Sequence, residues 1–149
     1  MSGKIKSHQA LLKEVVNKNV VTISPESPLS EAAYIMMNED VGALVVIDRE
    51  SRPVGVITDR DLVVSVMAEG LNPGELTVEE VMTKDPVTVA EDKDIFEMLR
   101  ILSENSIRRL PVTRGGKLEG IVSVDDLIVV VATELANLAM ALSSKSKVL

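Results

Sequence analysis

The sequence contains an internal repeat, and this feature constrains the fold more than any other. The segment that runs from Gly55 to Leu62 (GVITDRDL) recurs from Gly120 to Leu127 as GIVSVDDL, 65 residues later. A shorter pair, Val20–Ile23 and Pro86–Val89, recurs in the same order with nearly the same separation. Turns tolerate a one-residue difference in length. The repeat therefore predicts a tandem of two similar units.

Both units show the same predicted order of elements, β-α-β-β-α, which is a mixed α/β (α+β) class. A short β-rich run opens each unit. In the second unit, apolar residues then recur at i, i+3, i+4 and i+7, which is one face of a helix; these are Ile95, Met98, Leu99 and Leu102. Two apolar strands and a closing helix follow. The strands are predicted over 43–47 and 54–57 in the first unit, and over 110–113 and 118–122 in the second.

The first unit repeats the helical spacing with Leu29, Ala32, Ala33 and Met36. Ser27 is predicted to be the N-cap of this helix, with Pro28 at its first helical position. The closing helix of this unit is predicted over 59–69, because Gly70 is a usual residue just past a helix end.

The last predicted element is a long helix over 124–142. Its apolar residues alternate steps of three and four, a coiled-coil-like stripe: Ile128, Val131, Leu135, Leu138 and Leu142. Two interpretations stay open. The stripe packs either on its own domain or against another subunit, since so small a chain has limited core to cover it.

Composition excludes several classes of function. Aromatic residues make up 1% of the 149 residues, so modules that stack nucleic-acid bases on rings are disfavoured. The net charge of −7 also disfavours nucleic acid as a partner. The absence of cysteine suits a cytoplasmic protein. No signal-peptide core begins the sequence. The most apolar stretch, 127–142, is interrupted by polar residues and shorter than the roughly 20 residues of a membrane span, so no membrane contact is expected.

The repeat carries the first candidate site, Thr58-Asp59-Arg60-Asp61, which is mirrored by Ser123-Val124-Asp125-Asp126. Each follows an apolar strand and opens a helix. A hydroxyl followed three residues later by a carboxylate is typical of a capping box. The same geometry also favours a nucleotide. Free N–H groups at a helix start bind phosphate, and a nearby carboxylate accepts the hydroxyls of a ribose. The two interpretations are compatible.

The second candidate site is Arg108-Arg109-Leu110-Pro111. Adjacent strand residues point to opposite faces, so one arginine is expected to face a phosphate and the other to pair with an acidic neighbour. Ordinary surface ion pairing is the alternative interpretation. The first unit has Gly42-Ala43 at these positions, which makes the two candidate sites unequal. No metal-binding cluster and no nucleophile–base pair stands out, so the chain is not expected to be an enzyme.

These motifs resemble a tandem pair of cystathionine-beta-synthase (CBS) domains, often called a Bateman module. The resemblance rests on the two repeated segments, on Gly42–Asp48 (GALVVID) and on Glu80–Thr83 (EVMT), and covers about residues 12–132. It implies two domains, 12–70 and 76–135, flanked by an N-terminal polar segment, 1–11, and a helical extension, 136–149. It also implies packed sheets, clefts between the units and a disc-like homodimer.

The resemblance further implies a function, which is to bind an adenosine-containing ligand such as AMP, ADP or ATP. No cofactor is expected to be required. Residues that match the family's binding positions would form the sites; they are Val21, Thr22, Thr58, Arg60, Asp61, Val87, Thr88, Arg108, Arg109, Pro111, Ser123, Asp125 and Asp126. The leading hypothesis is a stand-alone sensing module that regulates a partner protein. The alternative is a structural oligomerisation module whose clefts are vestigial.

Overall fold

Two sheets organise the part of the chain that this computed structural model describes, residues 13–144. The first sheet has the strand order β1-β2-β3-β4 and the second has the order β5-β6-β7. In each sheet the first pair of strands is parallel and the next pair is antiparallel. The elements of the first unit are β1 (Thr22–Ile23), α2 (Leu29–Glu39), β2 (Ala43–Ile47), β3 (Pro53–Thr58), α3 (Asp59–Asp61) and the π-helix η1 (Leu62–Met67). The segment that precedes the second unit forms α4 (Val78–Val81) and β4 (Thr83–Lys84), and β4 joins the sheet of the first unit.

The second unit repeats this plan with a longer last helix. Its elements are β5 (Val89–Ala90), α5 (Ile95–Glu104), β6 (Arg109–Arg114), β7 (Lys117–Ser123) and α6 (Val124–Ser144). The β-α-β-β-α order predicted from the repeat is therefore confirmed in both units. The strand runs predicted at 43–47, 54–57, 110–113 and 118–122 all lie within β2, β3, β6 and β7.

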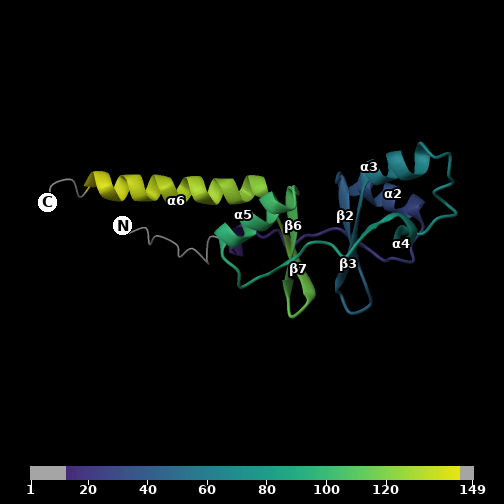
Figure 1. Cartoon of the computed structure of the whole chain (residues 1–149), viewed down its shortest axis with the longest axis horizontal. Helices are drawn as coiled ribbons and strands as arrows, with labels where there is room; N and C mark the ends of the chain where they lie inside the picture. Colours follow the sequence, from purple (N-terminus) through teal and green to yellow (C-terminus); the bar gives the residue numbers. More distant parts are fainter. Residues whose placement is uncertain (1–12, 145–149) are drawn as a thin grey trace.

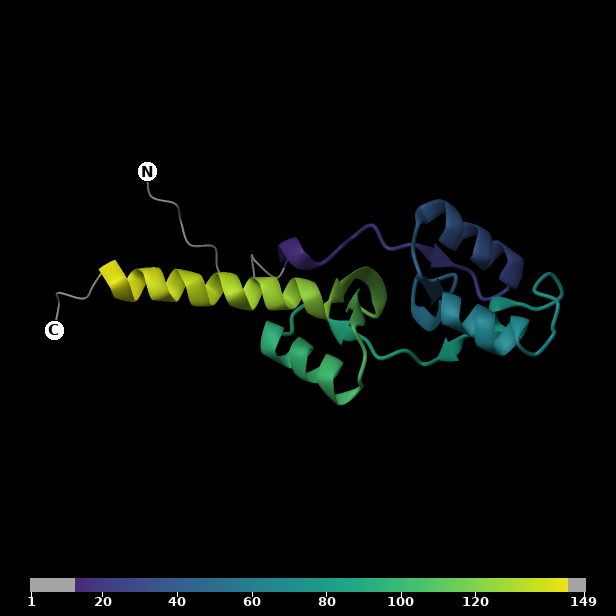
Figure 2. The ribbon, with the colours of Figure 1, turned by 90° about the horizontal axis from the view of Figure 1, so that it is seen from above.

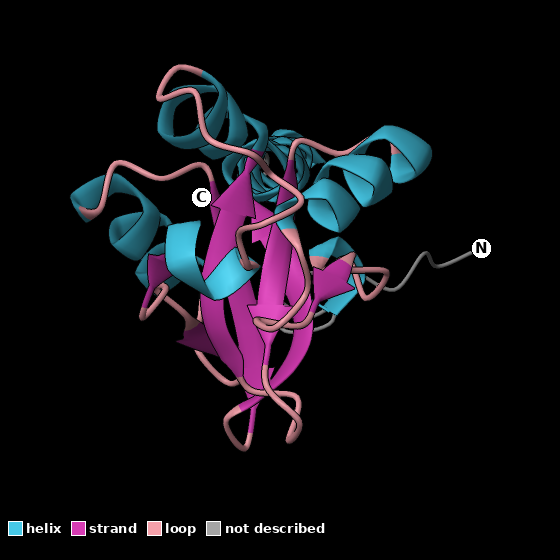
Figure 3. Ribbon diagram, turned by 90° about the vertical axis from the view of Figure 1, so that its right-hand side faces the viewer, coloured by secondary structure: helices cyan, strands magenta, loops and turns pink. Residues whose placement is uncertain are grey.

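The two sheets face each other, and the helices lie on their outer sides (Figure 1; Figure 3 views the stack from one end). Val45 of β2 and Pro111 of β6 are both buried, although neither belongs to the helix-side core of its unit. Leu44 and Leu110, their neighbours along the strands, do belong to those cores. Because strand side chains alternate between faces, Val45 and Pro111 point to the space between the sheets. The predicted packing of the sheets is confirmed.

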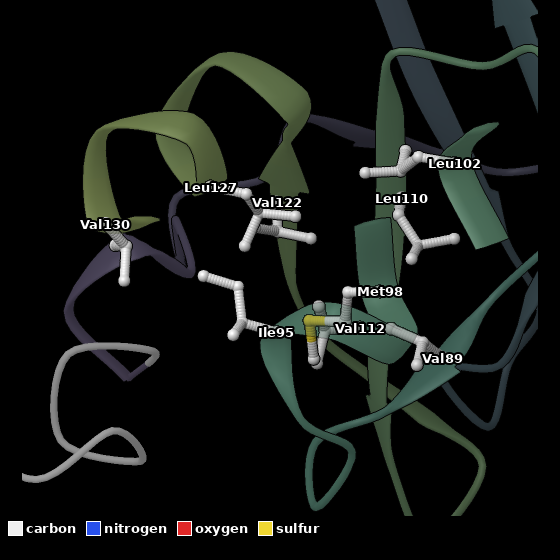
Figure 4. Close-up of a cluster of buried hydrophobic side chains, with 9 residues drawn as sticks. All are labelled: Val89, Ile95, Met98, Leu102, Leu110, Val112, Val122, Leu127 and Val130. Carbon is white, nitrogen blue, oxygen red and sulfur yellow. The ribbon is translucent and has the colours of Figure 1, made fainter. Parts of the chain in front are cut away.

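Each unit has its own aliphatic core on the helix side of its sheet. In the second unit, Ile95, Met98 and Leu102 project from one face of α5 and are at most 2% exposed. They meet side chains from the strands and from the start of α6 (Figure 4), which are Val89, Leu110, Val112, Val122, Leu127 and Val130. The helical periodicity of α5 is thus confirmed as a core-facing pattern. Neither core cluster contains an aromatic side chain.

Four local predictions need correction. The N-cap of α2 is Pro28 and not Ser27, because the Ser27 carbonyl accepts the Val78 N–H at 2.8 Å and the chain enters the helix one residue later. The opening strand of the first unit is only Thr22–Ile23. Its counterpart begins at Val89 instead of 87. The closing helix predicted over 59–69 turns into a π-helix at Leu62.

The segment before each unit pairs with the sheet of the other unit. Asn17, which precedes the first unit, exchanges backbone hydrogen bonds of 2.8 and 2.9 Å with Ile121 of β7. β4, which precedes the second unit, pairs with Gly55 and Val56 of β3. A Cβ at Gly120 would lie 2.7 Å from the Asn17 carbonyl oxygen, so only glycine allows this close approach. Each unit is therefore linked to the other by the segment that precedes it, through a single bridge at Asn17 and through the strand β4.

The helix α6 continues far beyond the second unit (Figure 2). Only Leu127 and Val130 of its 21 residues are buried. Most of the coiled-coil-like stripe is exposed, including Leu135 at 62% and Leu142 at 65%. The interpretation that this stripe packs on its own domain is wrong for the part beyond Val131. The helix is also long and apolar enough to cross a membrane by length and composition alone, whereas the sequence stretch was expected to be too short.

Candidate functional site

The first helix start, at Thr58, forms a complete capping box. The Thr58 hydroxyl accepts the Asp61 N–H at 3.1 Å, and the Asp61 carboxylate accepts the Thr58 N–H at 2.9 Å. The capping interpretation of this motif is therefore confirmed. The Asp61 carboxylate keeps one oxygen, Oδ1, outside this box, and Arg60 beside it is exposed.

The second helix start, at Ser123, is capped on one side only. The Ser123 hydroxyl accepts the Asp126 N–H at 3.1 Å. Among residues 13–144, no hydrogen bond or ion pair engages the Asp126 carboxylate, which is exposed. The repeated motif therefore has two different states. In the first unit its carboxylate caps the helix, and in the second unit its carboxylate is available.

The two adjacent arginines of the second unit also differ. Arg108 lies just before β6 and donates to the Asp125 carboxylate at 2.8 Å, with both side chains more than 70% exposed. Arg109 is the first residue of β6, is exposed, and has no ion pair within the described range 13–144. The expectation that one arginine pairs with an acidic neighbour is confirmed for Arg108. Of the two arginines, Arg109 is therefore the one whose guanidinium is available to bind an anion.

Sheet register brings several candidate residues to one face. Arg109 lies opposite Ser123, and Pro111 lies opposite Ile121, across β6 and β7. Cross-strand partners share a face of the sheet, and Pro111 marks it as the face between the two sheets. In the first unit, Thr22 lies opposite Val45 on the corresponding face. The remaining candidates of the opening runs are half-buried: Val21, Val87 and Thr88.

Two hollows lie beside the N-terminal segment of the described chain. A cavity of about 360 Å³ is lined by Lys13, Lys18, Lys93 and Arg114, together with acidic and apolar side chains. A shallower hollow of about 460 Å³ runs along 13–18 and reaches Asp126. Of the thirteen residues predicted for the site, only Asp126 lines either hollow. No sequence motif pointed to Lys13 or Lys18, since their position depends on a long-range strand pairing.

Two of the cations around the 360 Å³ cavity, Arg114 and Lys18, form ion pairs. Arg114 donates to Glu91 at 2.8 Å and lies 3.4 Å from Glu119, and the hydrogen bond to Glu91 is the main cause that raises the pKa of Arg114. Lys18 lies 3.7 Å from the same Glu119 carboxylate. Within residues 13–144 no group of three or more His, Cys, Asp or Glu side chains is arranged to hold a metal ion.

The comparison with protein families identifies the class of protein that this fold and these motifs define. The model of the CBS domain matches the chain twice, over residues 12–68 and 78–133. The chain belongs to the CBS-domain family and is a tandem CBS pair. The resemblance inferred from the repeat is therefore confirmed.

Individual relatives support the same assignment. The chain is 37% identical over 116 residues to an uncharacterized protein, MK0525, of Methanopyrus kandleri, covering 77% of this chain and 59% of that protein. It is 33% identical to hypoxic response protein 1 of Mycobacterium tuberculosis, covering 77% of this chain and 80% of the relative. The matches thus include short CBS-domain proteins, and the chain spans less than two thirds of the MK0525 sequence.

Solved structures show the same architecture. The crystal structure of hypoxic response protein 1 with two coordinated zinc ions has a TM-score of 0.71 and 31% identity, covering 83% of this chain and 97% of that one. The crystal structure of CBSX2 in complex with AMP has a TM-score of 0.69 and 25% identity, covering 84% and 97%. The fold of this chain is therefore shared with a CBS pair that holds an adenine nucleotide.

Proposed function

We propose that this chain is a regulatory module that binds AMP, ADP or ATP beside the start of α6. The observation that carries the proposal is the difference between the two repeated helix starts. The capping box uses the Asp61 carboxylate, whereas the Asp126 carboxylate has no partner among residues 13–144. A free carboxylate can accept both hydroxyls of a ribose, so the second unit is the better nucleoside site.

The phosphate of the ligand would meet Arg109 and the N–H groups at the start of α6. Arg109 shares its sheet face with Ser123, the N-cap residue, and has no ion pair within the described residues. A guanidinium bonds two phosphate oxygens with its planar fork, and a helix start favours negative charge. The AMP complex of the related CBSX2 supports an adenine nucleotide as the ligand.

Binding would act by shifting the arrangement of the two units, or of two chains in a homodimer. A ligand that prefers one arrangement stabilises it, and a partner protein that reads this arrangement would respond to the ligand. The proposed role needs no catalytic step. We place this role in the cytoplasm, in line with the cysteine-free composition.

Calorimetric titration tests this function. AMP, ADP, ATP and S-adenosylmethionine are titrated up to millimolar concentration, with GMP as a control that keeps the sugar and phosphate and changes the base. We expect saturable heat from at least one adenine nucleotide and weaker heat from GMP. Silence from all four adenosyl ligands would overturn the proposal.

The second candidate function is a structural oligomerisation module whose nucleotide sites are vestigial. The exposed apolar residues on the outer half of α6 favour it. Sedimentation velocity separates the two candidates. A regulatory module changes its sedimentation coefficient or its assembly when AMP is added, and a structural module does not.

A further inference from the structure

We propose that the apolar stripe of α6 pairs in antiparallel orientation with the same stripe of a second copy of this chain. We define the α6 stripe as Ile128, Val131, Leu135, Leu138 and Leu142. The outer part of the stripe lies beyond the start of α6, where the nucleotide site is proposed, and the inference does not rest on the proposed function.

The outer part of the stripe has no cover within the described chain. Leu135, Leu138 and Leu142 are 62%, 56% and 65% exposed. The last buried residue of the helix is Val130, and beyond it α6 projects away from both units (Figures 1 and 2). Three exposed leucines on one side of a helix are a surface that binds another apolar surface.

A membrane span does not fit this helix, although its length and composition alone would allow one. Leu127 and Val130 are fixed in the core of the second unit, so the first two turns cannot enter a bilayer. The part that projects, from Val131 to Ser144, has 14 residues. At a rise of about 1.5 Å per residue this part is about 21 Å long, and the hydrocarbon core is about 30 Å thick.

The surface of a membrane does not fit either. Helices that lie on anionic bilayers carry Lys and Arg on their polar face, and α6 contains no basic residue. Its polar side chains on the projecting part are acidic or neutral, among them Glu134 and Asn137. The partner that remains is a protein surface with a matching apolar stripe.

The spacing of the stripe identifies that surface as another α6. Steps of three and four residues form the seam of a left-handed helix pair, in which each side chain enters a hole of the facing helix. Such a seam is self-complementary under a two-fold axis, which is the commonest symmetry of soluble oligomers. When Leu135 faces Leu138 of the second copy, Val131 faces Leu142 of the second copy, and every member from 131 to 142 has an apolar neighbour.

The charges along the sequence favour the antiparallel orientation. α6 begins with Asp125 and Asp126 in its first turn. A parallel pair would bring the carboxylates of both copies together at one end. An antiparallel pair keeps the two acidic starts apart, and it places the dipoles of the two helices in opposite directions.

A mass measurement tests the pairing with a matched control on the same helix. Leu138→Lys places a charge in the stripe, and Met140→Lys places it on the far side, at a residue that is 70% exposed. We expect sedimentation equilibrium to give half the wild-type mass for Leu138→Lys and the wild-type mass for Met140→Lys. Both changes are at exposed sites, and circular dichroism verifies that the fold is kept. A wild-type monomer, or equal masses for Leu138→Lys and wild type, would overturn the proposal.

Engineered cysteines test the orientation, because the chain has no cysteine of its own. An antiparallel pair places residue 142 opposite residue 131 of the second copy. A mixture of Val131→Cys and Leu142→Cys chains should therefore form a mixed disulfide under mild oxidation. Leu142→Cys alone should not form a disulfide-linked dimer, since its two thiols would lie about 16 Å apart along the helix. A disulfide dimer of Leu142→Cys alone would show parallel helices, and flotation of the wild-type protein with lipid vesicles would show a membrane partner; either result contradicts the proposal.

Discussion

The Asp48 carboxylate stabilises the turn between β2 and β3 through hydrogen bonds within that turn. In the turn between β2 and β3, one Asp48 oxygen accepts the N–H groups of Glu50 and Arg52, each at 2.9 Å. The other oxygen accepts the Arg52 Nε–H at 2.8 Å. The backbone bond from Arg52 is the main cause that lowers the pKa of Asp48.

The lowered pKa of Asp48 predicts a pH dependence of stability. A carboxyl whose pKa is lower in the folded state stabilises the fold fully above its unfolded pKa, near 3.9. This stabilisation is lost as pH falls through the folded value. Urea unfolding of wild type and Asp48→Asn between about pH 5 and pH 2 measures it. The stability difference between the two should shrink towards low pH, and a difference independent of pH would contradict the assignment.

Asp125 is expected to weaken nucleotide binding. Its carboxylate holds Arg108 at 2.8 Å and adds negative charge at the start of α6, where a phosphate would lie. Asp125→Asn keeps the shape, removes this charge and releases Arg108. We predict that AMP binds roughly three- to tenfold more tightly to this variant, which corresponds to about 1 kcal/mol.

Arg108→Ala is the control variant for this calorimetric measurement. That substitution breaks the same ion pair but leaves the Asp125 charge in place. It should not tighten AMP binding. If Asp125→Asn binds AMP more weakly than wild type, Asp125 is itself a ligand contact and does not repel the phosphate.

At the scale of elements, the pairings of Asn17 with β7 and of β4 with β3 predict unequal losses of stability for alanine at two equivalent glycines. A Cβ at Gly120 would lie 2.5 Å from Val16 Cγ1 and 2.7 Å from the Asn17 carbonyl oxygen, which is backbone. A Cβ at Gly55 would meet mainly the flexible Met82 side chain, at 2.3 Å from its sulfur. We predict that Gly120→Ala destabilises the fold by about 1–3 kcal/mol and Gly55→Ala by less.

Urea unfolding measures both free energies, and amide exchange locates the effect. Loss of protection should be concentrated at Asn17 and Ile121 in Gly120→Ala, since these residues exchange the hydrogen bonds of the N-terminal segment. An equal or greater destabilisation in Gly55→Ala would show that the backbone contact at Gly120 does not dominate.

The elements also show where sequence-based prediction succeeds and where it stops. α5 and the strands of both hairpins could be predicted, because their periodicity coincides with burial. The pairing of Asn17 with β7 could not, because two-residue contacts between distant segments leave no periodic pattern. The π-helix η1 could not either, since nothing in the sequence of Leu62–Met67 distinguishes a π-helix from an α-helix.

The sequence predicted which residue types form the candidate site, but it did not predict which hydrogen bonds their side chains make. Thr58 and Ser123 were expected to be alike, and both do cap helices. The difference lies in the carboxylates, because Asp61 returns to the backbone N–H of Thr58 and Asp126 does not return to Ser123. The two motifs differ at three of their four residues, and the capping-box pattern alone does not say whether the carboxylate returns to the backbone.

For the whole molecule, the tandem arrangement explains how a chain with 1% aromatic residues could bind a nucleotide as proposed. Two aliphatic cores support two facing sheets, and the polar helix starts lie at the ends of those sheets (Figure 1). An adenine would be held by aliphatic side chains and backbone groups, with no ring to stack on. The central claim is that the second unit supplies the main nucleotide site.

The most direct test of this claim compares the AMP dissociation constants of Asp126→Ala and Asp61→Ala by calorimetry. Asp126→Ala removes a carboxylate that no residue within 13–144 uses, so its effect on stability should be small, as circular dichroism melting verifies. We predict that Asp126→Ala weakens AMP binding about tenfold or more, the equivalent of about 1.4 kcal/mol, and that Asp61→Ala has a clearly smaller effect. Equal losses in the two variants, or undiminished binding to Asp126→Ala, would contradict the claim.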